Sequence, residues 1–239
     1  LDKVVGKYFS DRRSRQLLEY AMVFLGTSPK DAPALYSIMS HMDLNQGVFY
    51  PRSGLAAIPR SIGKLAESLG AEIITGTPVK KIEVDDQGNI QGVRTSEGRI
   101  EADLVVVNAD YSFAETELLD PAYRSFPAAY WKRKVWAPSM FILYLGLNKK
   151  LAHLTHHNLY FAPQWHNHFD TIFEHPAWPE KPCFYISCIS KTDPESAPAG
   201  GENVFVLVPV APGLDDTDER RNRYADYIIE HIENITGES

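Results

Sequence analysis

The feature that most constrains the fold is the run Leu104–Val107, which is continuously apolar and stops abruptly at Asn108-Ala109-Asp110. A strand that is buried on both faces has this pattern, because neither face alternates with polar residues. In open α/β sheets, ligands bind at the carboxyl ends of such strands. The run therefore predicts a buried strand that brings residues 108–110 to a ligand. The sequence contains no glycine-rich phosphate-binding fingerprint to identify that ligand.

Periodicity and turn residues predict the other elements. Helices are expected over residues 11–25, 32–42, 55–69, 112–119 and 218–235. Strands are expected over 46–51, 71–75, 79–84, 139–147, 183–189 and 204–210, with two more inside 90–103. Residues 158–184 are dense in Tyr, Phe, Trp, His and Pro, and few helix signals occur there.

The long aromatic strands of the second half interrupt an α/β pattern, so we predict an α/β (α+β) fold in which a substrate domain is inserted into a Rossmann-like nucleotide-binding domain. The substrate domain has mixed β-sheet and helices. Its helical part is expected at 1–50, its sheet at 121–215 and a further helix at 216–239. Residues 51–120 are expected to be the central part of the nucleotide-binding domain.

Charge and composition exclude several classes of protein. The formal net charge of −7 argues against nucleic acid as a partner. No apolar run approaches the roughly 20 residues that span a bilayer, and the start does not resemble a signal peptide. Cys183 and Cys188 are five residues apart, so a strand places them on opposite faces and they are expected to be reduced thiols of a cytoplasmic protein. Because the sequence starts at Leu1 without Met, we expect a piece of a longer polypeptide.

An ordered set of motifs resembles the central region of bacterial-type phytoene desaturases, which are FAD-dependent carotenoid dehydrogenases of the amine oxidase superfamily. The first motif is "GVFYPRSGLAAIPRSIGKLAES", followed by "TPVKKIEV" and "IEADLVVVNAD". The second is "SMFILYLGLNKKLAHLTHHNLYF". The resemblance implies that residues 51–120 belong to an FAD-binding domain and that the intact protein desaturates a long isoprenoid such as phytoene.

The resemblance also implies which residues contact FAD. The backbone of Val79 lies beside the adenine, and Asn108, Ala109 and Asp110 lie on the adenosine and pyrophosphate side. The alternative for Asp110 is a plain helix cap. In the family, the dinucleotide fingerprint lies upstream of this sequence and a second flavin-contacting stretch lies downstream. We therefore expect FAD in the intact protein, and expect this chain alone to hold it weakly and to be inactive.

Gly54 belongs to a loop that the resemblance places near the isoalloxazine ring. The family pattern is Y-P-x-G-G, whereas this sequence reads "YPRSG", with Ser53 in place of the first glycine. Gly54 retains the freedom to adopt a positive φ. The alternative is an ordinary turn between a strand and a helix.

Four aromatic residues, Tyr160, Phe161, Trp165 and Phe184, are candidates for binding an apolar isoprenoid substrate. A polyene has no hydrogen-bonding groups, so its affinity must come from buried apolar area. The alternative is that these aromatics are ordinary core residues. No catalytic residue is assigned, because a bound flavin accepts the hydride and the protein supplies orientation and exclusion of water.

Two further clusters have alternative interpretations. Six histidines between His153 and His175 could suggest a metal site, but no cysteine or carboxylate pattern accompanies them, and we expect no metal. The segment "WKRKVW", Trp131–Trp136, is either a solvated loop or a patch for peripheral contact with a membrane. Oligomeric state stays open. The rival functions are a same-fold carotenoid isomerase, retinol saturase-like enzyme or amine oxidase, and an apolar-ligand binding protein without redox activity.

Overall fold

The computed structural model describes residues 1–238, and for Val23 and Phe24 only the backbone. It divides into two compact units, each of which is described by itself. The first unit comprises residues 1–60 and the chain from Trp136 onward, and the second comprises residues 61–135.

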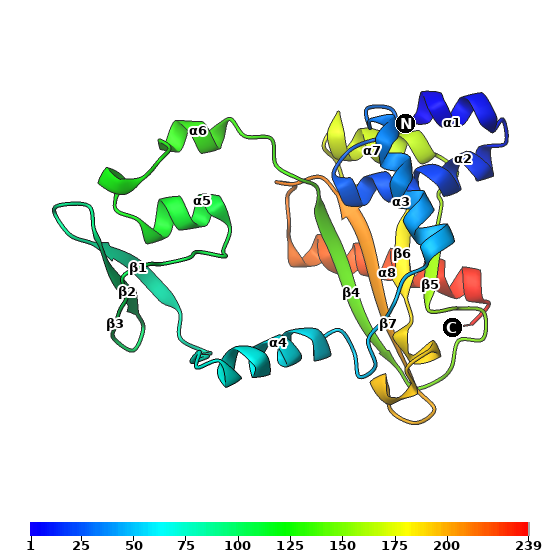
Figure 1. Cartoon of the computed structure of the whole chain (residues 1–239). Helices are drawn as coiled ribbons and strands as arrows, with labels where there is room; N and C mark the ends of the chain where they lie inside the picture. Colours follow the sequence, from blue (N-terminus) through cyan, green and yellow to red (C-terminus); the bar gives the residue numbers. More distant parts are fainter. Residues whose placement is uncertain (239) are drawn as a thin grey trace. The chain divides into compact units, whose positions relative to one another are not determined.

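A four-stranded antiparallel sheet organises the first unit (Figure 1). Its strands are β4 (Ser139–Leu147), β7 (Glu202–Val210), β6 (Phe184–Ser187) and β5 (His157–Tyr160), given in their order across the sheet. The strands predicted over 139–147 and 204–210 are confirmed.

One face of this sheet packs against helix α8 (Asp218–Thr236), which confirms the helix predicted over 218–235. Thr217 caps its first turn by accepting the Arg220 N–H at 3.3 Å, and Gly237 ends it with φ 71°. The register pairs Phe141 with Val208, so both side chains point to the helix. The buried side chains of this core include Phe141, Phe184, Ile186, Val204, Val206, Val208, Ile228 and Ile232. Burying each of them stabilises the fold by about 1.5–3 kcal/mol.

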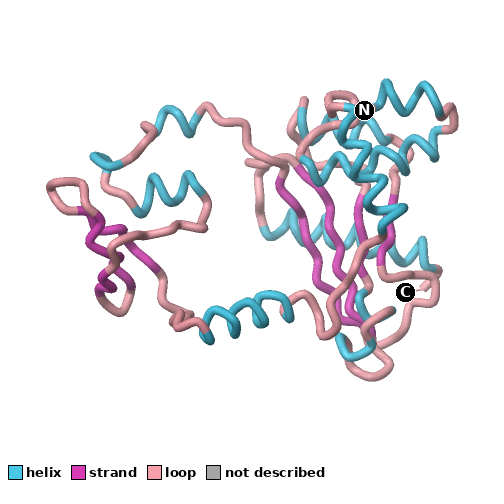
Figure 2. Tube along the Cα trace, in the orientation of Figure 1, coloured by secondary structure: helices cyan, strands magenta, loops and turns pink. Residues whose placement is uncertain are grey.

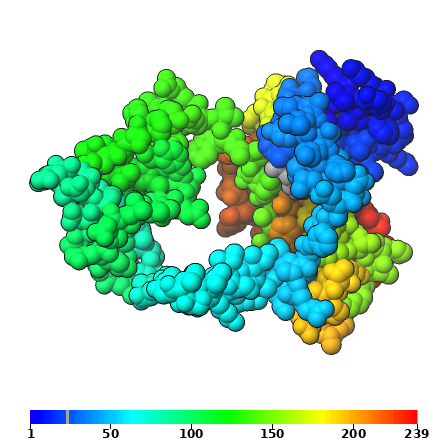
Figure 3. Space-filling view, viewed as in Figure 1, coloured from blue at the N-terminus to red at the C-terminus, as the bar shows by residue number. Residues whose placement is uncertain are grey.

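Short helices from the amino-terminal segment, together with α7, cover the end of the sheet where β5 finishes and β6 begins (Figures 1 and 3). They are α1 (Asp2–Tyr8), α2 (Arg12–Glu19), α3 (Ser37–His41) and α7 (Trp165–Phe173), with 3-10 turns over Tyr20–Leu25 and Ala34–Tyr36 and a π turn over Met42–Gln46. Asp11 caps α2 by accepting the Ser14 N–H at 2.8 Å. The helix predicted over 11–25 thus begins and ends as expected, but it tightens to 3-10 geometry from Tyr20 onward.

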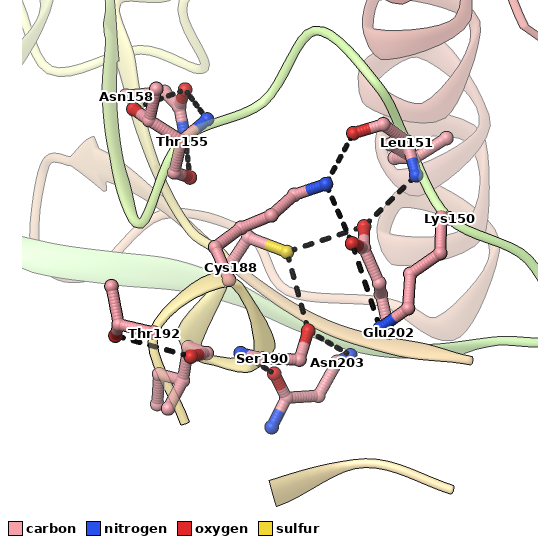
Figure 4. Close-up of polar contacts among 11 residues, drawn as sticks. Lys150, Leu151, Thr155, Asn158, Cys188, Ser190, Thr192, Glu202 and Asn203 are labelled. Carbon is pink, nitrogen blue, oxygen red and sulfur yellow. Dashed lines mark hydrogen bonds and ion pairs between the residues drawn. The ribbon is translucent and has the colours of Figure 1, made fainter. Parts of the chain in front are cut away.

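A buried ion pair fixes the loops at the opposite end of the sheet (Figure 4). The Glu202 carboxylate is 0% exposed; it lies 2.6 Å from the Lys191 ammonium and accepts the Leu151 N–H at 3.0 Å and the Cys188 thiol at 3.4 Å. Burial by itself raises the pKa of Glu202, but the hydrogen bonds from Lys191, Leu151 and Cys188 outweigh it and hold the pKa below its ordinary value. Glu202 therefore joins the start of β7 to two separate loops.

The second unit contains a three-stranded meander and short helical segments (Figure 2). Strands β1 (Val79–Val84), β2 (Ile90–Thr95) and β3 (Arg99–Glu101) confirm the meander predicted from the turns at Gly88 and Gly98. Helix α4 (Ala57–Ser68) precedes it, and α5 (Tyr111–Phe113), a π turn (Ala114–Leu118), a 3-10 turn (Pro121–Tyr123) and α6 (Ala128–Lys132) follow it. Ile82, Ala114 and Leu118 are its buried apolar side chains.

The buried strand predicted at Leu104–Val107 is wrong for this chain. The run is extended but unpaired, and Leu104 and Val106 are 77% and 84% exposed. A strand needs a neighbouring strand to satisfy its backbone groups, and no described residue pairs with this run. The strands predicted over 46–51 and 71–75 are wrong for the same reason.

The apolar stripe of α4 is also exposed, although the helix itself and its end at Gly70 are confirmed. The segment Trp131–Trp136, considered above as a membrane patch, is partly engaged in an aromatic cluster. The Trp131 ring packs edge-on against Tyr111 and Tyr130 at 5.1 Å each, and the Lys134 ammonium lies 4.1 Å above the Tyr130 ring. Because of these contacts, little of the Trp131 ring is available to contact a membrane.

Candidate functional site

A small apolar pocket, with a cavity volume of about 40 Å³, lies in the first unit where β5 and β6 meet α7. Its walls come from the start of the 3-10 turn at Tyr20, the strand ends and one face of α7. The lining residues are Tyr20, Leu159, Tyr160, Phe161, Trp165, His168, Phe169, Cys183, Phe184, Tyr185, Leu207 and Pro209. Apolar walls with a few convergent polar groups are typical of small-molecule sites.

All four aromatics predicted to bind substrate line this pocket. The ring centroids of Phe161 and Trp165 are 5.3 Å apart, and Trp165 is 5.0 Å from Phe169. Tyr160 and Phe184 stack on each other at 4.8 Å and also contact His231 of α8. The aromatics therefore serve the pocket and the core at once, and their role in binding a substrate stays a prediction.

Sequence reasoning did not predict α7, which supplies one wall of the pocket. Its buried side chains are Trp165, His168, Phe169 and Ile172, at positions i, i+3, i+4 and i+7. This spacing is the signal of an amphipathic helix, but the aromatic and Pro-rich composition of 158–184 obscured it. The expectation of few helices there was wrong.

A separate open groove of about 530 Å³ lies along the second face of the sheet. Tyr185 lines both spaces. Tyr144 and Phe205, opposite each other on β4 and β7, form the floor of the groove, and Tyr144 is 79% exposed. A sheet face that meets water is normally polar, so an exposed aromatic floor marks this face as a surface suited to apolar contact.

Two hydroxyl groups at the pocket are already hydrogen-bonded. Tyr20 donates to the Asp43 carboxylate, and Tyr185 lies 2.6 Å from Nδ1 of His157. Burial and the Asp43 charge raise the pKa of Tyr20. Burial raises the pKa of the Cys183 thiol to about 11, so the pocket holds no thiolate at neutral pH.

A second, polar cavity adjoins the first at Trp165 and contains a buried carboxyl group. Glu19 is 2% exposed. Its pKa is raised to about 7 by burial and by the charge of Asp2, against the opposing effect of Arg15. Glu19 was not predicted, because nothing in the local sequence of α2 marks it as buried.

The residues predicted to contact FAD fall in both units, so each is described only locally. Gly54 adopts φ 84°, as predicted, and Ser53 before it adopts φ 69°. Val79 begins β1, which is an edge strand of the meander. Asn108, Ala109 and Asp110 are exposed.

Asp110 acts as a helix cap by accepting the Phe113 N–H at 2.8 Å, which confirms the capping interpretation. Among the clustered histidines, His156 and His157 stack at 4.1 Å, while His168 is buried against the pocket. In the part of the chain that the structure describes, no three His, Cys, Asp or Glu side chains lie close enough to hold a metal ion. Both cysteines are free thiols, as predicted.

The sequence profile of the flavin containing amine oxidoreductases matches residues 2–239, so the chain belongs to this family. It is 43% identical to the carotenoid 3,4-desaturase of Haloarcula japonica over 234 residues, covering 98% of this chain and 47% of that protein. It is 37% identical to the zeta-carotene-forming phytoene desaturase of Myxococcus xanthus, covering 90% of this chain and 41% of that protein. The chain thus spans about half the length of the curated relatives it matches or less.

The fold is similar to that of a solved oxidoreductase from Methanosarcina mazei, with a TM-score of 0.63 and 16% identity. The match covers 99% of this chain and 52% of that structure. It supports the predicted α+β fold that contains part of a Rossmann-like domain.

Proposed function

We propose that this chain is the central part of an FAD-dependent oxidoreductase that introduces double bonds into a long isoprenoid such as phytoene. The observation that carries the proposal is the aromatic groove on the sheet and the apolar pocket that shares Tyr185 with it, in a chain 43% identical to a carotenoid desaturase. Burial of apolar area at about 25 cal/mol per Å² would supply the affinity for such a chain.

The proposed residues fit a flavin cofactor in their local geometry. Val79 is the first residue of β1, whose outer side is open to an adenine because β1 is an edge strand of the meander. Asn108 and Ala109 are small and exposed, so a dinucleotide can approach the backbone closely. Gly54 has no Cβ atom, which permits its φ of 84° and would let the ring system approach the loop closely. The glycine fingerprint that binds the pyrophosphate is not among these residues, so they supply only part of the site.

The flavin, when bound, accepts a hydride from the substrate. The residues of this chain would contribute binding and exclusion of water. Phe161 and Trp165 would enclose one end of the isoprenoid, and Tyr144 and Phe205 would support the extended chain along the sheet. A dry, rigid wall holds the reacting carbons in a fixed position, which is the main contribution a protein makes to such a reaction.

Peripheral contact with a membrane from the cytoplasmic side is part of this proposal, because the substrate dissolves in lipid. The corner between α1 and α2 supports it, since Tyr8 and Phe9 are exposed there beside Lys7 and Arg13. Aromatic and basic side chains together bind anionic interfaces. No helix in the described part of the chain has the length and apolar character needed to cross a bilayer.

The full-length protein with FAD, incubated with phytoene in lipid vesicles, tests the proposal. The expected result is a red shift of the absorption spectrum as conjugation lengthens. Turnover of an amine without any desaturated product would support an amine oxidase, and geometric isomerisation alone would support an isomerase. Binding without bound flavin would support a carrier; any of these three outcomes refutes the proposal.

A further inference from the structure

An unbroken series of aromatic rings leads from the floor of the groove across the second face of the sheet. The ring centroid of Phe205, in that floor, lies 6.4 Å from the ring centroid of Tyr185. The Tyr185 ring stacks on His157 at 5.9 Å, and His157 stacks on His156 at 4.1 Å. The Tyr50 ring packs edge-on against His156 at 5.3 Å. The series therefore joins the groove to an open cavity of about 830 Å³ that both histidines and Tyr50 line.

Polar contacts fix the two histidines in this series. The Tyr185 hydroxyl group lies 2.6 Å from Nδ1 of His157, in a solvent-exposed position. The Thr192 hydroxyl group lies 2.6 Å from Nδ1 of His156. A phenol that is hydrogen-bonded to an imidazole nitrogen can pass a proton to it. Tyr185 therefore links the apolar groove to a base that faces the open cavity.

The loop that contains Gly54 borders the same groove. Leu55, which follows Gly54, lines the groove together with Tyr185. A Cβ atom at Gly54 would lie 3.3 Å from the Tyr50 hydroxyl oxygen, so this loop also contacts the far end of the ring series. The proposed function puts the Gly54 loop beside the flavin ring system. The part of an isoprenoid between Leu55 and Tyr185 would then lie near both the flavin and the Tyr185 side chain.

Desaturation needs an acceptor for a proton as well as an acceptor for a hydride. The described side chains that line the groove include no carboxylate, amine or imidazole. The lining residues with hydroxyl groups are Tyr144, Tyr185 and Ser187. In the part of the chain that the structure describes, Tyr185 alone among these three is hydrogen-bonded to a base. Tyr185 is thus the proton acceptor that the groove offers.

We propose that Tyr185 and His157 together take up the proton that the substrate loses. This inference rests on the proposed function and adds to it a catalytic residue, Tyr185, and a positioning residue, His157, which acts through it. One carbon of the substrate loses a hydride to the flavin, and its neighbour loses a proton to the phenolic oxygen of Tyr185. As that proton arrives, Tyr185 passes its own proton to Nδ1 of His157. The electron pair of the second C–H bond becomes the π bond of the product.

The surroundings of His157 favour the imidazolium that this step forms. Burial and the charge of His157 lower the pKa of His156, so the His156 ring is neutral at neutral pH. The other charged residues that line the cavity are Asp193, Glu195 and Arg52, and two carboxylates outweigh one guanidinium there. Because the cavity is open, the imidazolium can release its proton to water.

The test measures kcat and substrate affinity of the full-length protein with FAD and with phytoene in lipid vesicles. Tyr185→Phe removes only the hydroxyl group, and we expect it to lower kcat by roughly 100-fold or more, as loss of acid–base catalysis usually does. Affinity for phytoene, followed by tryptophan fluorescence, should change by less than about threefold, because the apolar ring remains in the groove. His157→Ala should lower kcat similarly. Added imidazole should restore part of this loss but none of the loss in Tyr185→Phe.

Nitrogen-15 NMR of the histidines, recorded on the full-length protein without substrate, gives a readout that does not depend on turnover. His157→Ala identifies the His157 resonances by their loss. Nδ1 of His157 is expected to carry no proton and to accept the Tyr185 hydroxyl group, so its resonance should shift in Tyr185→Phe. His153→Ala is the matched control, because His153 is exposed and lines neither the groove nor the cavity. Its kcat should match that of the wild type, with or without imidazole.

The possible failures are distinguishable. Desaturation by Tyr185→Phe at the wild-type kcat overturns the inference and leaves the proposed function standing. A proton on Nδ1 of His157, or a His157→Ala protein that imidazole does not reactivate, has the same consequence. No desaturated product from the wild-type protein refutes the proposed function and the inference with it. If Tyr185→Phe does not fold, the response of His157→Ala to imidazole and the Nδ1 resonance decide.

Discussion

Replacing Glu202 with Gln should be among the most destabilising conservative substitutions in this chain. The substitution keeps the shape of the side chain but removes the charge that faces Lys191 at 2.6 Å. The ammonium would then lie without its counterion in a site where its own side chain is only 20% exposed. Breaking a buried ion pair by removing one partner costs about 3–5 kcal/mol. Because Lys191 retains some access to water and still donates to the Leu151 carbonyl, we expect a loss of about 2–4 kcal/mol.

Denaturant unfolding followed by circular dichroism measures this loss. The matched control is Glu174→Gln, which removes a carboxylate from the exposed pair with Lys30, where the two side chains are 49% and 73% exposed. An exposed pair contributes about 0–1 kcal/mol, so the control should unfold almost as the wild type does. Lys191→Met should also be destabilising, because it leaves a fully buried carboxylate with only the Lys150 ammonium, 4.0 Å away, as a cation.

The pH dependence provides an independent check. The folded-state pKa of Glu202 lies below its ordinary value of 4.5, so its contribution is fully present above pH 4.5 and is lost as the pH falls through the lowered pKa. The difference in stability between wild type and Glu202→Gln should therefore shrink below pH 4.5. A loss under 1 kcal/mol at neutral pH, equal to that of Glu174→Gln, would refute the reasoning.

Three other substitutions test local features by the same unfolding measurement. Ser53→Gly should stabilise the chain by about 1 kcal/mol, because Ser53 has φ 69°, a conformation that glycine adopts without strain; a loss of stability would contradict this. Gly92→Ala should lower the free energy of unfolding by more than about 3 kcal/mol, because a Cβ atom there would lie 2.1 Å from the Ile100 carbonyl oxygen on β3. A nearly unchanged free energy of unfolding would show that the strands separate easily. The pKa of Glu19 is raised to about 7, so the folded protein loses stability as the pH rises from 4.5 to 7 and this carboxyl group ionises. Glu19→Gln should therefore be more stable than wild type by roughly 1–3 kcal/mol at pH 8 and equal to it at pH 4. A stability difference that is the same at both pH values would contradict the buried carboxyl group.

The sequence alone determined the elements whose signals are local. The apolar run of β4 and the helical pattern of α8 were readable from neighbouring residues, because strand and helix patterns repeat within a few positions of the chain. The four aromatics that line the pocket were candidates from the sequence, because a polyene without hydrogen-bonding groups must bind through buried apolar area.

Only the tertiary structure determined which of these segments are buried and which side chains contact one another. Leu104–Val107 has the pattern of a core strand, yet it is exposed because no described strand lies beside it. Glu202 and Glu19 look like ordinary surface carboxylates in the sequence, and each is buried by residues far away in the chain. The Nδ1 atom of His168 accepts the backbone N–H of Cys183, fifteen positions away. Burial, pKa and hydrogen-bond pairing arise from contacts between distant segments, and a local pattern carries no information about them.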